Sequence, residues 1–295
     1  MNGSRSRRPW ACRVGRSLSI VAPAKLNLAL AVTGVRTDGY HDLRSVFATL
    51  DLSDLVRVAR HTRLEVRNTR DIGTGEDIAA RAVRALATAT GHDAHAFVRI
   101  RKRIPIAAGL GGGSSDAAAV LRGLALLWGT DADLVQVAAG VGSDVPFFAS
   151  GAPVALVEGR GEVVRPLARP REPLHVVVVR PTLRLRTADV YTEFRMADRH
   201  AIAHVDALAA AFATGAVTPD FARVHLENDL LPAAERLCPQ IASWRAAAAA
   251  RGIALAMTGS GPTLFAVADD RADALRMARI LRHTGLRARP QTVAP

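Results

Sequence analysis

The stretch Pro105-Ile-Ala-Ala-Gly-Leu-Gly-Gly-Gly-Ser-Ser-Asp-Ala-Ala-Ala119 decides the fold expected for this chain. Before it, Ala96–Arg101 alternates apolar and polar side chains, which predicts a strand. After it, apolar residues between positions 117 and 124 recur three and four apart, which predicts one face of a helix. Glycines let the backbone approach a ligand closely, and the free N–H groups at a helix start favour an anion. The order strand, glycine loop, helix therefore predicts a phosphate-binding site.

Two common phosphate-binding motifs do not fit this loop. A Walker A loop ends in Gly-Lys-Ser/Thr, and no lysine follows Gly113. A dinucleotide fingerprint needs a third glycine where Ser114 stands. The plain alternative is a flexible turn capped by serine, but four glycines and two serines at a helix start argue against it.

The composition is ordinary for a globular protein, with 49% hydrophobic and 22% charged residues. At 295 residues the chain suits one large domain or two modest ones. Cys12 and Cys238 are the only cysteines, so we expect neither a disulfide framework nor a metal cluster, which fits a reducing cytoplasm. No apolar run approaches the ~20 residues that a membrane helix needs.

The net charge of +12 raises the question of a nucleic-acid partner. The arginines are scattered and aromatic residues make up only 4% of the chain, so we expect anionic small molecules as partners and no nucleic acid. Lys25 and Lys102 are the only lysines among 39 basic residues. In a chain that uses arginine almost everywhere else, these two positions indicate a need for a compact ammonium group.

The chain divides into three parts by composition. Residues 1–18 hold five arginines and no acid, so we expect a disordered basic extension or a start codon placed too early. The linker-like Arg169-Pro-Arg-Glu-Pro173 separates a first half, residues 19–168, from a second half, residues 169–295. Strands in the first half, then strands mixed with helices, predict an α+β fold with two layers that share a cleft.

The patterns predict these elements in order. Strands are expected at residues 19–35 (two strands broken at 23–27), 43–50, 55–60, 64–67, 96–101, 154–157, 163–167, 174–179, 253–257 and 263–267. Helices are expected at residues 76–90, from 114 onward, 131–137 with Asp131 at its start, 187–194, 200–213, 221–236, 240–251 and 270–282.

Two charged residues fit a phosphoryl-transfer site once the glycine loop is present. In an extended Pro23–Asn27, Lys25 and Asn27 lie on the same side of the chain. Such a site needs one carboxylate to accept the proton of the attacking hydroxyl, and Asp144 is the candidate. A neighbouring ammonium, here Lys25, stabilises the transferring group. Taken singly, Lys25 would be a snorkelling surface residue and Asp144 a cap.

Six segments carry a resemblance to known kinases. Pro105–Ser115 resembles the phosphate loop of the small-molecule kinases named after galactokinase, homoserine kinase, mevalonate kinase and phosphomevalonate kinase. Residues 22–28 with 36–41 resemble the opening of the 4-diphosphocytidyl-2-C-methyl-D-erythritol kinase family. Residues 142–146, 227–230 and 258–261 match the same family in the same order. The resemblance runs from about Ser19 to near the C-terminus.

The resemblance implies a two-domain α+β kinase fold with ATP and substrate in the cleft between the domains. It makes residues 19–168 the N-terminal ATP-binding kinase domain and 169–295 the C-terminal kinase domain. It implies ATP-dependent phosphorylation of a hydroxyl of 4-diphosphocytidyl-2-C-methyl-D-erythritol, giving the 2-phosphate and ADP, in the non-mevalonate isoprenoid pathway. ATP and Mg²⁺ are the implied cofactors, and the implied location is cytoplasmic.

The resemblance also implies roles for single residues. Asp144 becomes the catalytic base and Lys25 its partner. Tyr40 and His41 match the family's cytosine-reading pair, and Tyr191 matches the aromatic residue on the other face of that ring. The implied ATP-binding residues are Lys102, Pro105, Gly109, Leu110, Gly111, Gly112, Gly113, Ser114 and Ser115. The implied substrate-binding residues are Asn27, Tyr40, His41, Tyr191, Gly259, Ser260 and Gly261.

Some positions depart from the family or leave alternatives open. Gly75–Ile78 stands where the family often has Asp/Glu-Asn-Leu. Asp116 puts a negative charge beside the phosphate loop, so it must point away from ATP. No carboxylate is recognisable as a magnesium ligand; Ser115 is a candidate, with ATP and water holding most of the ion. Tyr40 and Tyr191, the only tyrosines, are alternatively half-buried surface rings.

Two other functions stay open. A homoserine or mevalonate kinase would have no use for the rings of Tyr40, His41 and Tyr191. A nucleotide-binding regulator without turnover would have no use for Lys25 and Asp144. The oligomeric state is left open.

Overall fold

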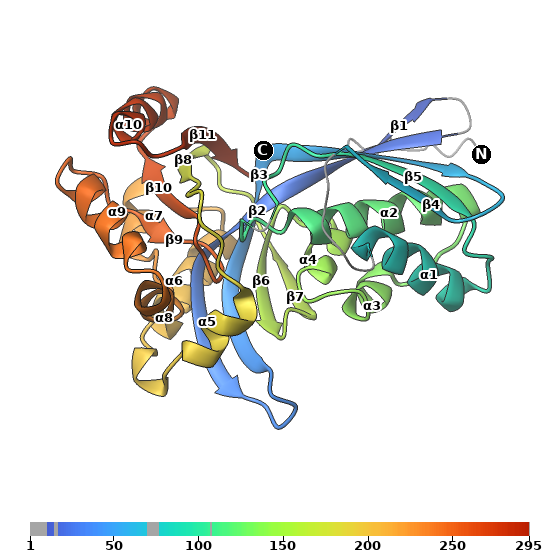
Figure 1. Cartoon of the computed structure of the whole chain (residues 1–295), viewed down its shortest axis with the longest axis horizontal. Helices are drawn as coiled ribbons and strands as arrows, with labels where there is room; N and C mark the ends of the chain where they lie inside the picture. The colour runs from blue at the N-terminus through green and yellow to red at the C-terminus, as the bar shows by residue number, and fades with distance from the viewer. Residues whose placement is uncertain (1–10, 15–16, 70–76, 107, 295) are drawn as a thin grey trace.

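The computed structural model describes residues 11–14, 17–69, 77–106 and 108–294. Two long antiparallel strands, β2 (Ser17–Val35) and β3 (His41–Arg60), run through both halves of the molecule (Figure 1). The sequence predicts a break within each, but both continue. Their pairing shifts register between Pro23 and Lys25 and between Asn27 and Ala29, so bulges absorb the irregular residues without ending the strands.

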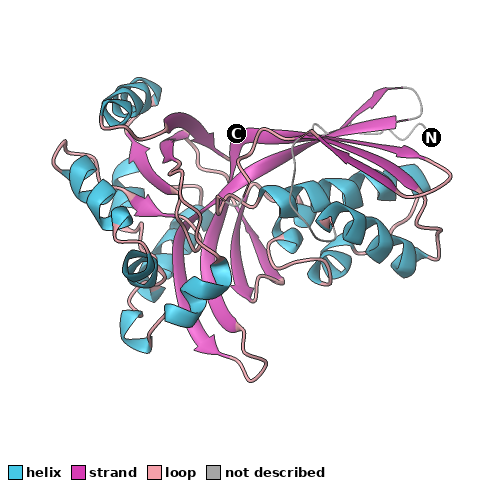
Figure 2. Cartoon of the chain, in the orientation of Figure 1, coloured by secondary structure: helices cyan, strands magenta, loops and turns pink. Residues whose placement is uncertain are grey.

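The first half packs helices against one face of a sheet (Figures 1 and 2). Its remaining strands are β1 (Ala11–Val14), β4 (Glu65–Asn68), β5 (Ala96–Arg101), β6 (Val154–Gly159) and β7 (Val163–Leu167). Its helices are α1 (Ile78–Thr90), α2 (Gly112–Trp128), α3 (Leu134–Ala139) and α4 (Val145–Ser150). The buried face of α2 packs with β2, β3 and α1 in one core.

The second half continues the same sheet. β11 (Ala288–Val293) lies between β3 and β8 (Leu174–Val179), followed by β10 (Leu264–Ala268) and β9 (Ala256–Met257). Among the described residues the strands form one sheet of eleven. The helices of this half are α5 (Thr187–Glu193), the 3₁₀ helix Met196–Asp198, α6 (Ile202–Ala213), α7 (Pro219–Val224), α8 (Leu231–Leu237), α9 (Gln240–Ala249) and α10 (Arg271–His283).

The α+β class is confirmed, and several details of the prediction are wrong. Ala11–Val14, expected within a disordered extension, pairs with β2 as strand β1; residues 1–10 and 15–16 lie outside the described chain. α3 begins after Asp133, whose side chain accepts the N–H groups of Val135 and Gln136, and not at Asp131. The helix expected at 221–236 is two helices, α7 and α8.

Strand β11 was not expected, and the strand predicted at 253–257 is limited to Ala256–Met257. β11 carries Arg289, Pro290 and Gln291, so it lacks the alternation that marks a strand. Residues 75 and 76 of Gly75–Ile78, the segment that departs from the family pattern, lie outside the described residues. Within the described part, the side chain of Asp77 caps α1 by accepting the N–H of Ala79. Among the described residues, no helix is both long and apolar enough to cross a bilayer.

Candidate active site

The glycine loop is held between the two halves of the molecule. Gly109 and Gly111 have φ of +70° and +68°, a region that favours glycine. A Cβ on Gly109 would lie 3.2 Å from the carbonyl oxygens of Thr258 and Gly261. A Cβ on Gly111 would lie 3.0 Å from Cγ of Lys25. The glycines therefore permit a close approach of three segments, and Gly111 leads directly into α2.

Lys25 is buried, only 3% exposed, beside this loop. Its N–H donates to the carbonyl of Leu110 at 3.0 Å. Its Nζ donates to Oδ1 of Asn27 at 2.6 Å and lies 4.4 Å from the ring centroid of Phe47. The prediction that Lys25 and Asn27 share one side of the chain is confirmed. These contacts fix the ammonium group in one place.

Asp144 is the carboxylate that faces this ammonium. Its Oδ2 lies 3.4 Å from Nζ of Lys25, and its side chain is 30% exposed. It stands at the N-cap position of α4, but its side chain makes no capping hydrogen bond. The carboxylate is therefore accessible and is not committed to the helix, as a proton acceptor requires.

The segment Thr258–Gly261 packs against Lys25 and Asn27. The Oγ1 of Thr258 accepts the N–H of Asn27 at 2.8 Å. Asn228 holds the segment from behind, because its Nδ2 donates to the carbonyls of Met257 and Gly259, each at 2.9 Å. Neither Thr258 nor Asn228 carries a predicted role, although both lie in segments that resemble the kinase family.

Ser260 and Gly259, two of the predicted substrate residues, lie in this segment. The hydroxyls of Ser260 and Thr187 are 3.0 Å apart, which ties the segment to the start of α5. Gly259 has φ of +58°, and a Cβ there would lie 3.9 Å from Nζ of Lys25. The structure therefore brings Gly259, Ser260, Asn27, Lys25 and Asp144 together.

The three predicted aromatic residues do not form the expected arrangement around an open slot. The ring centroids of His41 and Tyr191 are 5.0 Å apart. Two stacked layers need about 7 Å, so no base fits between these two rings as they stand. Phe194 also contacts His41, in a T-shaped arrangement with the ring centroids 5.9 Å apart. Tyr40 is 55% exposed, and its ring lies 5.1 Å from the guanidinium of Arg160.

Burial shifts the pKa values of both Tyr191 and His41. It raises the pKa of the Tyr191 hydroxyl, and the charge of Asp144 raises it further. Burial also lowers the pKa of His41 below its usual value, which favours the neutral imidazole at pH 7. The charge of Asp144 therefore acts on the Tyr191 hydroxyl.

Lys102 lies beneath the glycine loop in a buried cluster with Asp54 and Asp116. Its Nζ contacts Oδ2 of both carboxylates, at 2.5 Å and 2.6 Å. Oδ1 of Asp54 also accepts the N–H groups of Arg103 and Ile104, at the entry to the loop. The ammonium predicted to serve ATP is thus neutralised by two carboxylates, and Asp116 points toward Lys102 inside the protein.

We expect this cluster to give the protein a pH-dependent stability. Burial raises the pKa of Asp116 from 3.8 to about 7; Lys102 opposes the shift and Asp54 adds to it. An acid whose pKa is higher in the folded state binds more protons there between the two values, so stability falls as pH rises from about 4 to 7. Asp116→Asn should flatten melting temperature against pH across that window.

Asp131→Asn, at an exposed carboxylate, is the matched control and should keep the wild-type slope. A series of thermal melts between pH 4 and pH 8 measures all three proteins. If Asp116→Asn and wild type lose stability in parallel as pH rises, Asp116 is not the group responsible.

A magnesium site is marked only weakly. Among the described residues there is no cluster of three His, Cys, Asp or Glu side chains that could hold a metal. Ser115, in the first turn of α2, is 1% exposed, and its Oγ has no hydrogen-bond partner among the described residues. A free hydroxyl at this position fits one oxygen ligand, with phosphate and water supplying the others.

The comparisons with known proteins agree with this geometry. Two family models match, described as GHMP kinases N terminal domain over residues 77–152 and GHMP kinases C terminal over residues 219–286. The 4-diphosphocytidyl-2-C-methyl-D-erythritol kinase of Polaromonas naphthalenivorans (strain CJ2) is 40% identical over 270 residues, 86% of each chain. The chain belongs to the 4-diphosphocytidyl-2-C-methyl-D-erythritol kinase family.

Solved structures place the fold of this kinase family in a wider group. A crystal structure of 4-(cytidine 5'-diphospho)-2C-methyl-D-erythritol kinase has a TM-score of 0.77 and 37% identity, covering 93% of this chain and 98% of that chain. Homoserine kinase from Cytophaga hutchinsonii has a TM-score of 0.67 at 17% identity, covering 95% of each chain, and shows the shared fold alone. As a member of its family, the chain is an ATP-dependent kinase.

Proposed function

We propose that this kinase transfers the terminal phosphoryl group of ATP to a hydroxyl of 4-diphosphocytidyl-2-C-methyl-D-erythritol, giving the 2-phosphate and ADP. The observation that carries the proposal is the Lys25–Asp144 pair, 3.4 Å apart beside the glycine loop, in a chain of this family. We place the reaction in the non-mevalonate isoprenoid pathway and in the cytoplasm, with a small molecule as partner and neither nucleic acid nor membrane.

The reaction needs one proton acceptor and one phosphate cradle. Asp144 takes the proton as the substrate oxygen forms its bond to phosphorus, and ADP leaves with the electrons of the broken P–O bond. Lys25 stabilises the negative charge that develops on the transferring group. The N–H groups from Gly111 to Ser115 hold the phosphates at the start of α2.

Ser115 would contribute its free hydroxyl to Mg²⁺, which neutralises phosphate charge when bound. For Lys102 we propose that it supports the ATP site from beneath, since both its carboxylate partners are buried. Residues 19–168 would form the ATP-binding domain and residues 169–295 the domain that carries Thr258–Gly261 to the other wall of the cleft. Pro105, Gly109, Leu110 and Ser114 complete the proposed ATP loop.

The cytosine end of the substrate is assigned to the aromatic residues. Tyr191 would supply one stacking face, and Tyr40 with His41 the other side. Because His41 now contacts Tyr191 directly, the base must either displace the His41 ring or stack on another face of Tyr191. Asn27, Gly259, Ser260 and Gly261 would position the methylerythritol end near Lys25.

Measuring ADP formation with each of several alcohol substrates tests the proposal. The enzyme, with ATP and Mg²⁺, is offered 4-diphosphocytidyl-2-C-methyl-D-erythritol, homoserine and mevalonate in turn. We expect turnover on the first alone and inhibition of that turnover by cytidine 5'-diphosphate. Turnover on homoserine or mevalonate would favour the related kinases, and ATP binding without any turnover would favour a nucleotide-binding regulator.

Tyr191→Ala should raise the KM of the cytidine substrate about 5- to 150-fold, since a stacked base contributes ~1–3 kcal/mol. The KM of ATP should stay nearly constant, because ATP does not use this ring. Steady-state kinetics with each substrate varied in turn gives both values. Tyr191→Phe keeps the ring and should behave as wild type; an equal rise in both KM values for Tyr191→Ala would assign the ring to the fold.

A further inference from the structure

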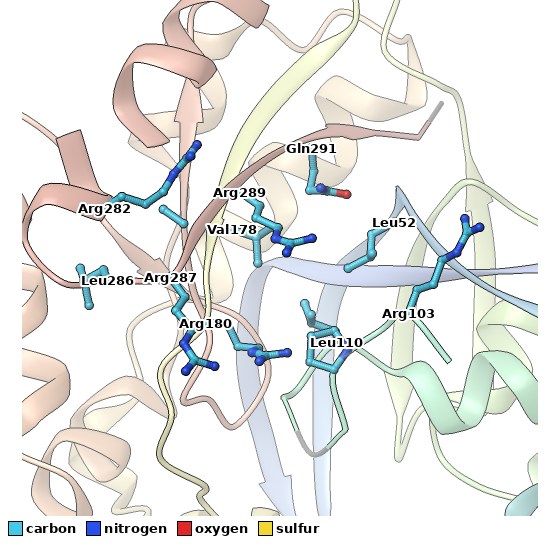
Figure 3. A pocket seen from close by; sticks show the side chains of 12 residues that line it. Leu52, Arg103, Leu110, Val178, Arg180, Arg282, Leu286, Arg287, Arg289 and Gln291 are labelled. Atoms are coloured by element: carbon cyan, nitrogen blue, oxygen red, sulfur yellow. The ribbon is translucent and has the colours of Figure 1, made fainter. Parts of the chain in front are cut away.

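A cavity of about 770 Å³ borders the glycine loop at Pro105 and Leu110. One wall comes from β8, β11 and the end of α10, and the other from β3 and the glycine loop (Figure 3). Pro105 and Leu110 are the only described loop residues in its wall, and neither Lys25, Asp144 nor the first turn of α2 borders it. Its volume is typical of a small-molecule site.

Five arginines line this arginine cavity: Arg103, Arg180, Arg282, Arg287 and Arg289. No aspartate or glutamate borders it among the described residues. Figure 3 shows Arg180 and Arg289 extending from the C-terminal strands toward the wall that carries Leu52 and Leu110. Gathering like charges in one hollow costs folding energy, so the arrangement indicates an anionic occupant.

Two arginines of this cavity, Arg287 and Arg289, differ from many others in the chain. Arg44, Arg223 and Arg236 each contact two carboxylates. By contrast, the side chains of Arg287 and Arg289 have no hydrogen-bond or ion-pair partner among the described residues, and both residues are exposed. Two unpaired guanidinium groups, two residues apart at the start of β11, supply planar donors that suit phosphate oxygens.

The rest of the lining is aliphatic. Leu52, Leu110, Val178 and Leu286 supply apolar surface, and no aromatic side chain borders the cavity among the described residues. An aliphatic body would be covered by these side chains, while its charged head meets the arginines. We propose that the arginine cavity is a second binding site, separate from the ATP and substrate sites, for a diphosphate ester of an aliphatic alcohol.

This site touches the catalytic machinery through one residue. Leu110 borders the cavity, and its carbonyl accepts the N–H of Lys25 at 3.0 Å. A second hollow of about 250 Å³ shares Arg180 and Arg287 and reaches Pro262, next to the substrate segment. An occupant of the arginine cavity therefore packs against the backbone that positions both the glycine loop and Lys25.

Isothermal titration of the full chain with geranyl diphosphate tests the proposal. We expect binding in the absence of nucleotide and also with a saturating non-hydrolysable ATP analogue and Mg²⁺. Inorganic pyrophosphate, which lacks the aliphatic body, should bind at least ~10-fold more weakly. No binding of geranyl diphosphate, or its displacement by the ATP analogue, overturns a separate site; equal binding of pyrophosphate overturns the aliphatic part.

The double variant Arg287→Gln/Arg289→Gln should weaken geranyl diphosphate binding at least ~10-fold, since each charged hydrogen bond lost lowers affinity about that much. Its kinase turnover without geranyl diphosphate should match wild type, which also shows that it folds. Arg63→Gln/Arg165→Gln removes the same charge at exposed positions away from the cavity and should bind as wild type. Equal weakening in both double variants would mean unspecific attraction to a basic protein and overturn the site.

Discussion

Asp144→Asn should lower kcat by about 10²- to 10⁴-fold, the usual range for loss of a general base. The amide keeps the shape and hydrogen-bonding capacity of the carboxylate but cannot accept the proton of the attacking hydroxyl. The KM of ATP should change little, because Asp144 faces Lys25 and does not belong to the glycine loop. Its side chain is partly exposed and caps nothing, so the melting temperature should also stay close to wild type.

Asp131→Asn, the exposed control, should keep wild-type kcat in the same assay. Single-turnover kinetics separates the chemical step from product release and shows whether the loss lies in chemistry. Normal turnover of Asp144→Asn would mean that the proton leaves by another route, and the assignment of the base would fail. That result would leave the family membership untouched, because membership depends on the whole chain.

The parts of this site that the sequence predicts are those held by local geometry. Alternation along an extended strand placed Lys25 and Asn27 on one side, and the structure joins them by a 2.6 Å hydrogen bond. The change from strand spacing to helical spacing placed the glycine loop between β5 and α2. Both features need only the period of the side chains over a few residues.

Contacts between distant residues could not be predicted from pattern alone. Asp54 lies 48 positions from Lys102 and belongs to β3, whereas Lys102 follows β5, so no local spacing relates them. The direct contact between His41 and Tyr191 likewise depends on how α5 packs beside the start of β3. Asn228 is an ordinary polar residue in the sequence, and its support of Gly259 appears only once the segments are folded together.

The glycines of the loop show why a motif does not separate binding from packing. The motif suggests that a side chain at Gly112 would simply block phosphate. In the structure, a Cβ at Gly112 would lie 2.9 Å from Cγ2 of the buried Ile104. Among the described residues, a Cβ at Gly113 would meet only Cγ2 of Ile78, at an ordinary 3.5 Å. Gly113 is therefore the position where a substitution tests phosphate binding with the least disturbance of the core.

Lys25→Arg should also lower kcat, by at least ~10²-fold, although it keeps the positive charge. The ammonium is buried between Oδ1 of Asn27, the ring of Phe47 and the carboxylate of Asp144. A planar guanidinium is wider and cannot direct one compact charge at the same point, so the pair is misaligned. Lys25→Met removes the charge in a side chain of similar length and should lose at least as much activity.

The decisive comparison is the double variant Lys25→Met/Asp144→Asn. If both groups act on one transition state, the double variant should be little worse than the worse single variant, because residues that work as a unit are non-additive. Thermal melts of all three variants exclude a loss of fold, and kcat/KM values complete the cycle. Losses that simply multiply would mean that Lys25 and Asp144 act independently, and that their 3.4 Å contact is an ion pair without a shared catalytic role.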